Sequence, residues 1–220
     1  MNNKLEMEWL RRNSLYLEKS FVQTFKHMAQ KYKLEHNISN VEKVYKLLGI
    51  RKQYLSYWEQ HTHSLRFKKG HYELIENAAK LFMLNEIEKE KLANRAGISM
   101  YKINNFDKFF REFLEIKKIK GKKLYEKALV SERMYHYICA GKHITKYTLI
   151  SLGIILNLNY LELNELLMKA GYTFSNSIAY DVIVSYIIKN SNLKGVKLLD
   201  YINDTLYTLN LPLLMTRGNL

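Results

Sequence analysis

The feature that most restricts the fold of this 220-residue chain is an internal repeat. When Gly49 is placed opposite Leu129, a first offset of 80 (129 minus 49), the two surrounding stretches run in register. Apolar and aromatic positions then coincide, pairing Val44 with Leu124, Tyr45 with Tyr125, Ile50 with Val130, Leu55 with Tyr135 and Trp58 with Ile138. Such a repeat predicts two related structural units in one chain.

The repeat continues at a shorter offset towards the end of each copy. Ala96-Gly97 aligns with Ala170-Gly171 at a second offset of 74 (171 minus 97). The first copy therefore carries six extra residues (80 minus 74), which we place in the loop from His61 to Lys69. The apolar period, the turn and the glycine stop all repeat, which argues against chance similarity.

The apolar residues of both copies recur at the three- and four-residue steps of amphipathic helices. Hydrophobic residues make up 47% of the chain and proline occurs once, as in helical globular proteins. We therefore expect an all-α fold of two tandem five-helix units plus C-terminal helices. The expected helical stretches are 5–33 (broken near Asn13-Ser14), 41–48, 51–59, 72–84, 86–95, 106–119, 178–188 and 196–211.

This pattern divides the chain into three regions. Residues 1–99 form an N-terminal helical domain with the first helix-turn-helix, 106–171 form the second unit, and 172–220 hold the C-terminal helices. The C-terminal helices carry more apolar positions than a pair of short helices can bury alone. They therefore either cover the second unit or form a homodimer interface.

The stretch from Leu48 to Glu59 combines a helix stop with a short second helix. Gly49 ends the first helix, Ile50 docks the turn, and Leu55 and Trp58 fall three residues apart on one face. The residues left to point outward are Arg51, Lys52, Gln53, Ser56 and Tyr57. A helix held by its apolar face while it presents cations, an amide and hydroxyls has the chemistry of a DNA recognition helix.

A formal net charge of +14 favours a polyanionic partner, nucleic acid before an anionic membrane surface. The charge is uneven, because residues 107–147 hold 11 Lys or Arg against 5 acids, a net +6, whereas residues 148–220 hold 5 against 5. A run of lysines, Lys117, Lys118, Lys120, Lys122 and Lys123, leads into the second motif. The run is either a solvated face or a contact with the phosphate backbone.

At these residues the chain resembles the lambda-repressor-like, or Xre-like, helix-turn-helix family in two tandem copies. The first copy carries the resemblance in Leu48-Gly49-Ile50 and in Leu55-Ser56-Tyr57-Trp58-Glu59. The second carries it in Leu124-Tyr125-Glu126-Lys127, Val130-Ser131, Ile138 and Gly141-Lys142, and continues through Leu156-Asn157-Leu158 to Glu165-Leu166-Leu167. Together the two copies cover about residues 20 to 171.

The resemblance implies sequence-specific binding of double-stranded DNA and a bacterial or phage transcriptional regulator. The expected DNA-binding residues are Arg51, Lys52, Gln53, Ser56, Tyr57, Arg66, Lys68, Lys69, Lys122, Lys123, Arg133, His136 and Lys142. The outward set of the second helix includes Glu132 and is less basic, which suits a protein contact or a weaker reader. The alternative function is a protein interaction module that keeps the fold without reading DNA and binds a polymerase, a toxin or another regulator.

The sequence favours neither an enzyme nor a metal or cofactor site. His61 and His63 with His71 lack a Cys or acid cluster to complete a metal site. Cys139 has His136 three residues away as a base, but its place on the inner side of the motif favours a buried structural thiol over a nucleophile. Phosphate-loop glycine patterns are absent. We infer no cofactor and no small-molecule ligand.

The compartment expected for the chain is the cytoplasm. A single cysteine excludes an internal disulfide and suits reducing conditions. No apolar run approaches the ~18 residues of a membrane span, and the first residues carry acids where a signal peptide needs an apolar stretch. We therefore expect no membrane association.

Overall fold

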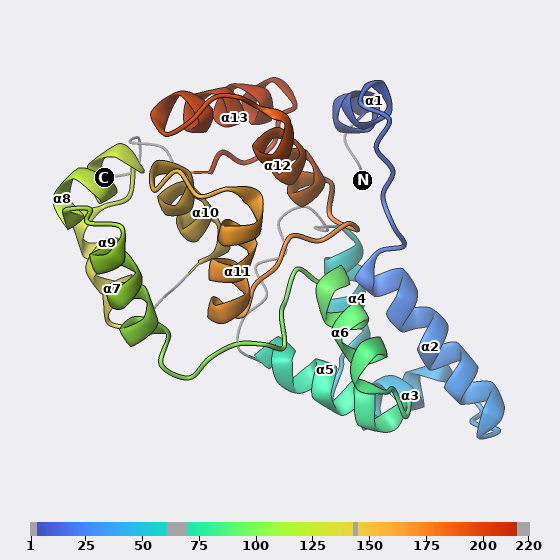
Figure 1. The fold of residues 1–220 in the computed structure, drawn as a ribbon. Helices are drawn as coiled ribbons and strands as arrows, with labels where there is room; N and C mark the ends of the chain where they lie inside the picture. The colour runs from blue at the N-terminus through green and yellow to red at the C-terminus, as the bar shows by residue number, and fades with distance from the viewer. Residues whose placement is uncertain (1–3, 61–69, 143–144, 215–220) are drawn as a thin grey trace. The chain divides into compact units, whose positions relative to one another are not determined.

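The computed structural model describes residues 4–60, 70–142 and 145–214 (Figure 1). Within these ranges the regular elements are all helices, which confirms the expected all-α class. The helices are α1 (Lys4–Arg12), α2 (Phe21–Glu35), α3 (Val41–Leu47), α4 (Lys52–Gln60), α5 (Gly70–Leu81), α6 (Glu86–Arg95), α7 (Phe106–Ile116), α8 (Gly121–Lys127), α9 (Glu132–Cys139), α10 (Lys146–Ile155), α11 (Tyr160–Ala170), α12 (Ala179–Asn190) and α13 (Val196–Thr208).

The chain separates into two compact units. Unit 1 comprises Met1–Met100 with Phe174–Val182, and unit 2 comprises Tyr101–Thr173 with Ile183–Leu220. The first division, between Met100 and Tyr101, falls between the predicted regions 1–99 and 106–171. Within the region 172–220, Phe174–Val182 belongs to unit 1, and the residues on either side of it belong to unit 2.

The internal repeat recurs in the backbone conformation of the helix ends. Left-handed residues occur at Gly49 (φ 68°) and Leu129 (φ 57°), which the first offset aligns, and at Met83 (φ 52°) and Asn157 (φ 54°), which the second offset aligns. The turns at Gly49 and Leu129 are closed by equivalent hydrogen bonds. The Ile50 N–H donates to the Tyr45 carbonyl, and the Val130 N–H donates to the Tyr125 carbonyl, each at 2.9 Å. The two offsets found in the sequence therefore describe equivalent helix ends.

Helix starts repeat in the same register. Asn85 caps α6 and Asn159 caps α11, and each forms a reciprocal capping box with a glutamate three residues later, Glu88 and Glu162. The carboxylate lies 3.0 Å from the Asn85 backbone nitrogen in α6 and 2.9 Å from that of Asn159 in α11. These caps satisfy backbone donors that the helix itself leaves without partners.

The predicted break near Asn13-Ser14 is longer than expected. Residues 13–20 are non-helical, and Ser20 rather than Ser14 caps the next helix through a capping box with Gln23. Ser14 takes a left-handed conformation (φ 53°), which no N-cap requires. Ser20, which has Gln23 three residues later, is therefore the serine that caps the start of α2.

The core of unit 1 forms around Phe25 in α2. Phe25 is fully buried and stacks on Phe21 and Tyr45, with ring centroids 5.7 and 6.3 Å away. Phe82 meets it edge-on at 5.9 Å. Tyr45, which aligns with Tyr125 in the repeat, is only 7% exposed and contributes its ring to this aromatic cluster.

In unit 2 the central helix is α10. Each residue from Thr148 to Ile155 is buried, so α10 contacts protein on all sides, and its neighbours include α8, α11 and α13. Gly153 allows the closest approach, because a Cβ there would lie 2.4 Å from Cδ1 of the buried Leu163. Since the apolar positions of α13 are buried within unit 2, this helix covers the unit; a homodimer interface stays a prediction.

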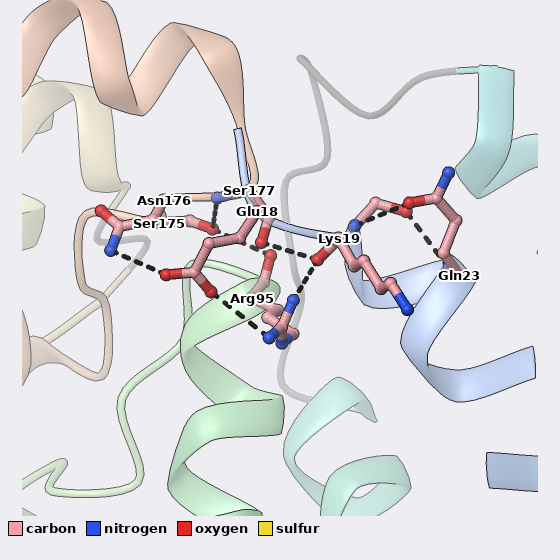
Figure 2. Close-up of polar contacts among 8 residues, drawn as sticks. Glu18, Lys19, Gln23, Arg95, Ser175, Asn176 and Ser177 are labelled. Atoms are coloured by element: carbon pink, nitrogen blue, oxygen red, sulfur yellow. Dashed lines mark hydrogen bonds and ion pairs between the residues drawn. The ribbon is translucent and has the colours of Figure 1, made fainter. Parts of the chain in front are cut away.

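A polar clasp within unit 1 holds the late segment 174–177 (Figure 2). Asn176 exchanges two hydrogen bonds with Glu18, through its carbonyl (3.0 Å) and its side-chain amide (3.2 Å). Arg95 pairs with the Glu18 carboxylate at 3.3 Å and donates to the Lys19 carbonyl. The Ser177 hydroxyl donates to the same carbonyl at 2.9 Å, and the Ser175 hydroxyl donates to the Arg95 carbonyl at 3.0 Å.

We predict that Arg95→Ala lowers the free energy of unfolding of unit 1 by about 1–3 kcal/mol, because it removes charged hydrogen bonds at a partly buried site. Both tryptophans of the chain, Trp9 and Trp58, belong to unit 1, so urea unfolding followed by tryptophan fluorescence reports on this unit. Lys91→Ala, an exposed position on the same helix, is the matched control. If both variants lower the free energy of unfolding equally, the clasp does not stabilise unit 1.

Candidate nucleic-acid interface

The first candidate motif is the pair α3 and α4 with the turn between them. Leu48 and Ile50 are buried on either side of the left-handed Gly49, and Leu55 of α4 is 2% exposed. α4 packs against α2, and Lys26 of α2 forms an ion pair of 2.6 Å with Glu59 near the end of α4. The turn and the buried face together fix the face that α4 presents to solvent.

The solvent face of α4 contains most of the predicted reading residues that the structure describes. Arg51, just before the helix, and Gln53 and Ser56 within it are exposed, and Tyr57 is 54% exposed. The side chains of Lys52 and Trp58 lie outside the described part of the structure, as do residues Arg66, Lys68 and Lys69 of the following loop. The described groups are a guanidinium, an amide and two hydroxyls.

The second candidate motif is the pair α8 and α9, whose turn has Leu129 in the left-handed conformation. Ser131 caps α9 by accepting the Met134 N–H at 3.2 Å, and Ile138 is fully buried. α9 packs against α7, just as α4 packs against α2 in unit 1. The start of α8 sits close to α9, since a Cβ on Gly121 would come within 2.7 Å of the Tyr135 hydroxyl oxygen.

The two predicted contact residues of α9, Arg133 and His136, each interact with another side chain of the same helix. The Arg133 guanidinium donates to the Tyr137 hydroxyl at 2.8 Å and lies 5.3 Å from the centre of the same ring. His136 lies 3.7 Å from the Glu132 carboxylate and forms an ion pair with it when protonated. Both side chains are exposed, but each already has a partner on its own helix.

The lysine run leading into α8 divides into one paired and several unpaired groups. Lys117 forms an ion pair of 3.1 Å with Glu162; the Asn159 backbone hydrogen bond and this ion pair lower the pKa of the Glu162 carboxyl. Lys118, Lys120, Lys122, Lys123 and Lys127 are exposed, and none pairs with a carboxylate among the described residues. Lys142 is exposed as well. Lys127 extends the run predicted from the sequence by one helical turn.

Cys139 lies on the inner side of α9 and is half-buried. Burial raises the pKa of its thiol, although a hydrogen bond with Tyr135 partly opposes the shift. Burial also raises the pKa of Tyr135 to about 12, and its ring packs 5.5 Å from that of Tyr125. The thiol is therefore protonated at neutral pH, in keeping with a packing role.

Neither a candidate metal site nor a candidate membrane-spanning helix occurs among the described residues. Those residues contain no group of three or more His, Cys, Asp or Glu that would hold a metal ion; His61 and His63 lie outside them. No described helix has both the length and the apolar character to cross a bilayer.

No protein-family model matches the chain, and neither do curated proteins or solved structures.

We predict that Gly49→Ala destabilises unit 1 by about 1 kcal/mol, because alanine is strained at φ 68°. A Cβ at this position meets no atom within 4 Å, so the cost is conformational rather than steric. Gly49→Asn should cost less, since asparagine tolerates the left-handed region. Urea unfolding followed by tryptophan fluorescence measures both variants, and equal losses would contradict a conformational origin.

Proposed function

We propose that the chain binds double-stranded DNA with sequence preference and acts as a bacterial or phage transcriptional regulator in the cytoplasm. In this proposal α2–α6 and α7–α11 are two lambda-repressor-like helix-turn-helix units. The main support for this proposal is helix α4, which follows a tight left-handed turn. Its Leu55 is buried, and its Gln53, Ser56 and Tyr57 are exposed. A helix of this kind fits the width of the major groove.

The exposed groups of α4 match the chemistry of base edges. A glutamine side chain donates and accepts at once, which suits the N6 and N7 groups of adenine, and arginine suits the O6 and N7 acceptors of guanine. Gln53 and Arg51 supply these two groups at the start of the helix, where recognition helices contact bases. Ser56 and Tyr57 follow one turn later and suit hydroxyl contacts with phosphate or base.

The charge of the protein supports the same partner. A net charge of +14 attracts a polyanion, and several lysines of unit 2 are free of carboxylate partners within the described structure. Salt dependence separates DNA binding from the competing function, a protein interaction module. Binding to DNA releases counterions and weakens steeply as salt rises, whereas an apolar protein contact does not.

We predict binding of the full chain to a random 20–30 base-pair duplex at low salt, with affinity falling by about 10³-fold or more between 50 and 200 mM salt if about six phosphates are contacted. Fluorescence anisotropy with labelled duplex measures both affinities. A single-stranded oligonucleotide of the same composition is the control for nonspecific polyanion binding. Absence of duplex binding at low salt would refute the proposed function and leave the interaction module as the better candidate.

We predict that Gln53→Ala lowers discrimination between a selected duplex and a random duplex by about 1–3 kcal/mol and affects random-duplex affinity much less. The selected duplex is obtained by repeated binding from a randomised pool. Gln30→Ala, an exposed glutamine on α2 of the same unit, is the matched control and should leave both affinities unchanged. If the sequence preference survives Gln53→Ala, α4 is not the reading helix.

A further inference from the structure

We infer that the two units contact DNA differently: unit 1 reads bases through α4, and unit 2 is a sequence-independent phosphate clamp built on the lysines around α8. This inference rests on the proposed function. The clamp comprises Lys118, Lys120, Lys122, Lys123 and Lys127. Unit 2 then binds the phosphate backbone of the DNA, and α9 reads no bases.

The clamp lysines are available to an external anion. All five are exposed, and none pairs with a carboxylate among the residues that the structure describes. Several other cations of unit 2 differ in this respect, because Lys117 pairs with Glu162, Arg111 with Asp107 and Lys169 with Glu165. Lys118 and Lys120 precede α8, and Lys122, Lys123 and Lys127 belong to it, so five lysines without carboxylate partners lie together in the sequence around this helix.

Their arrangement is unfavourable for an isolated helix. α8 has no acidic residue in its first turn, and Lys122 and Lys123 stand there near the positive end of the helix dipole. Lys123 and Lys127 are like charges four residues apart, a spacing that destabilises helices. A row of phosphates near these lysines would relieve both repulsions; Glu126 lies in the same helix but forms no ion pair with them.

Most of these lysines are not a consequence of the fold, because only Lys123 has a lysine, Lys43, opposite it in unit 1. At the first offset of the repeat, Lys122 aligns with Glu42 and Lys127 with Leu47. The turns that precede the two helices are also alike, since Lys118 (φ 51°) and Asn37 (φ 53°) are both left-handed and lie within one position of alignment. A similar backbone therefore carries fewer lysines in unit 1, where α3 has the exposed Lys43 and Lys46 together with Glu42.

The side chains of α9 that would read bases already contact other side chains of the same helix. Base contact by Arg133 would require breaking its hydrogen bond and ring contact with Tyr137. His136 faces the Glu132 carboxylate, whose negative charge also disfavours close approach of phosphates. On α4, by contrast, Gln53 is exposed and has no hydrogen-bond partner among the described residues. The two helices are thus suited to different roles.

The test compares salt slopes and sequence preference for the full chain by fluorescence anisotropy, with selected and random duplexes. Lys122→Ala/Lys123→Ala should reduce the slope of log affinity against log salt by about 2, since each phosphate contact contributes about 0.9. Both duplexes should be affected alike, so the affinity ratio between them stays constant. Lys194→Ala/Lys197→Ala, two exposed lysines elsewhere in unit 2, should change neither quantity.

Arg133→Ala provides the second arm and should also leave the affinity ratio constant. The clamp is refuted if Arg133→Ala or the double lysine variant changes this ratio by more than about fivefold, the smallest change expected for one lost base contact. It is equally refuted if the control lysines reduce the slope as much as Lys122 and Lys123 do. Those results leave the proposed function standing, whereas failure of the unmodified chain to bind any duplex overturns both.

Discussion

The left-handed turn between two short helices is the constraint on which both candidate surfaces depend. In unit 1 it is made at Gly49 at little conformational cost, and in unit 2 it is made at Leu129, where a non-glycine residue costs about 1–2 kcal/mol. The hydrogen bond from Val130 to Tyr125 and the burial of Val130 hold the second turn in that conformation. Because each turn fixes the direction of the helix that follows, it decides which residues reach solvent.

The same turn supports two different electrostatic surfaces. Around α4 the exposed groups are mixed, with an amide and hydroxyls beside a guanidinium, whereas around α8 they are mainly ammonium groups. Mixed donors and acceptors suit base edges, and ammonium groups suit phosphates. A chain with one of each would obtain specificity from one unit and salt-dependent affinity from the other, without a second copy of the reading helix.

The polar clasp of unit 1 shows how a segment near the end of the chain becomes part of the first unit. Segment 174–177 is held through backbone carbonyls and short polar side chains, including Ser175, Asn176 and Ser177. Their partners, Glu18 and Arg95, lie far away in the sequence, in the first half of the chain. Apolar periodicity in the sequence does not indicate such contacts, so the sequence alone assigns residues 172–220 to one group of C-terminal helices.

The sequence by itself determined the helices and their repetition, because amphipathic periodicity and capping are local properties of the chain. The expected stretches 41–48, 51–59 and 86–95 agree with α3, α4 and α6 to within one residue at each end. Only the tertiary structure decided which charged groups are free. It pairs Lys117 with Glu162 and leaves Lys118 exposed, a distinction that depends on which helix lies opposite. It likewise joins segment 174–177 to unit 1, since contacts between distant residues leave no periodic signal in the sequence.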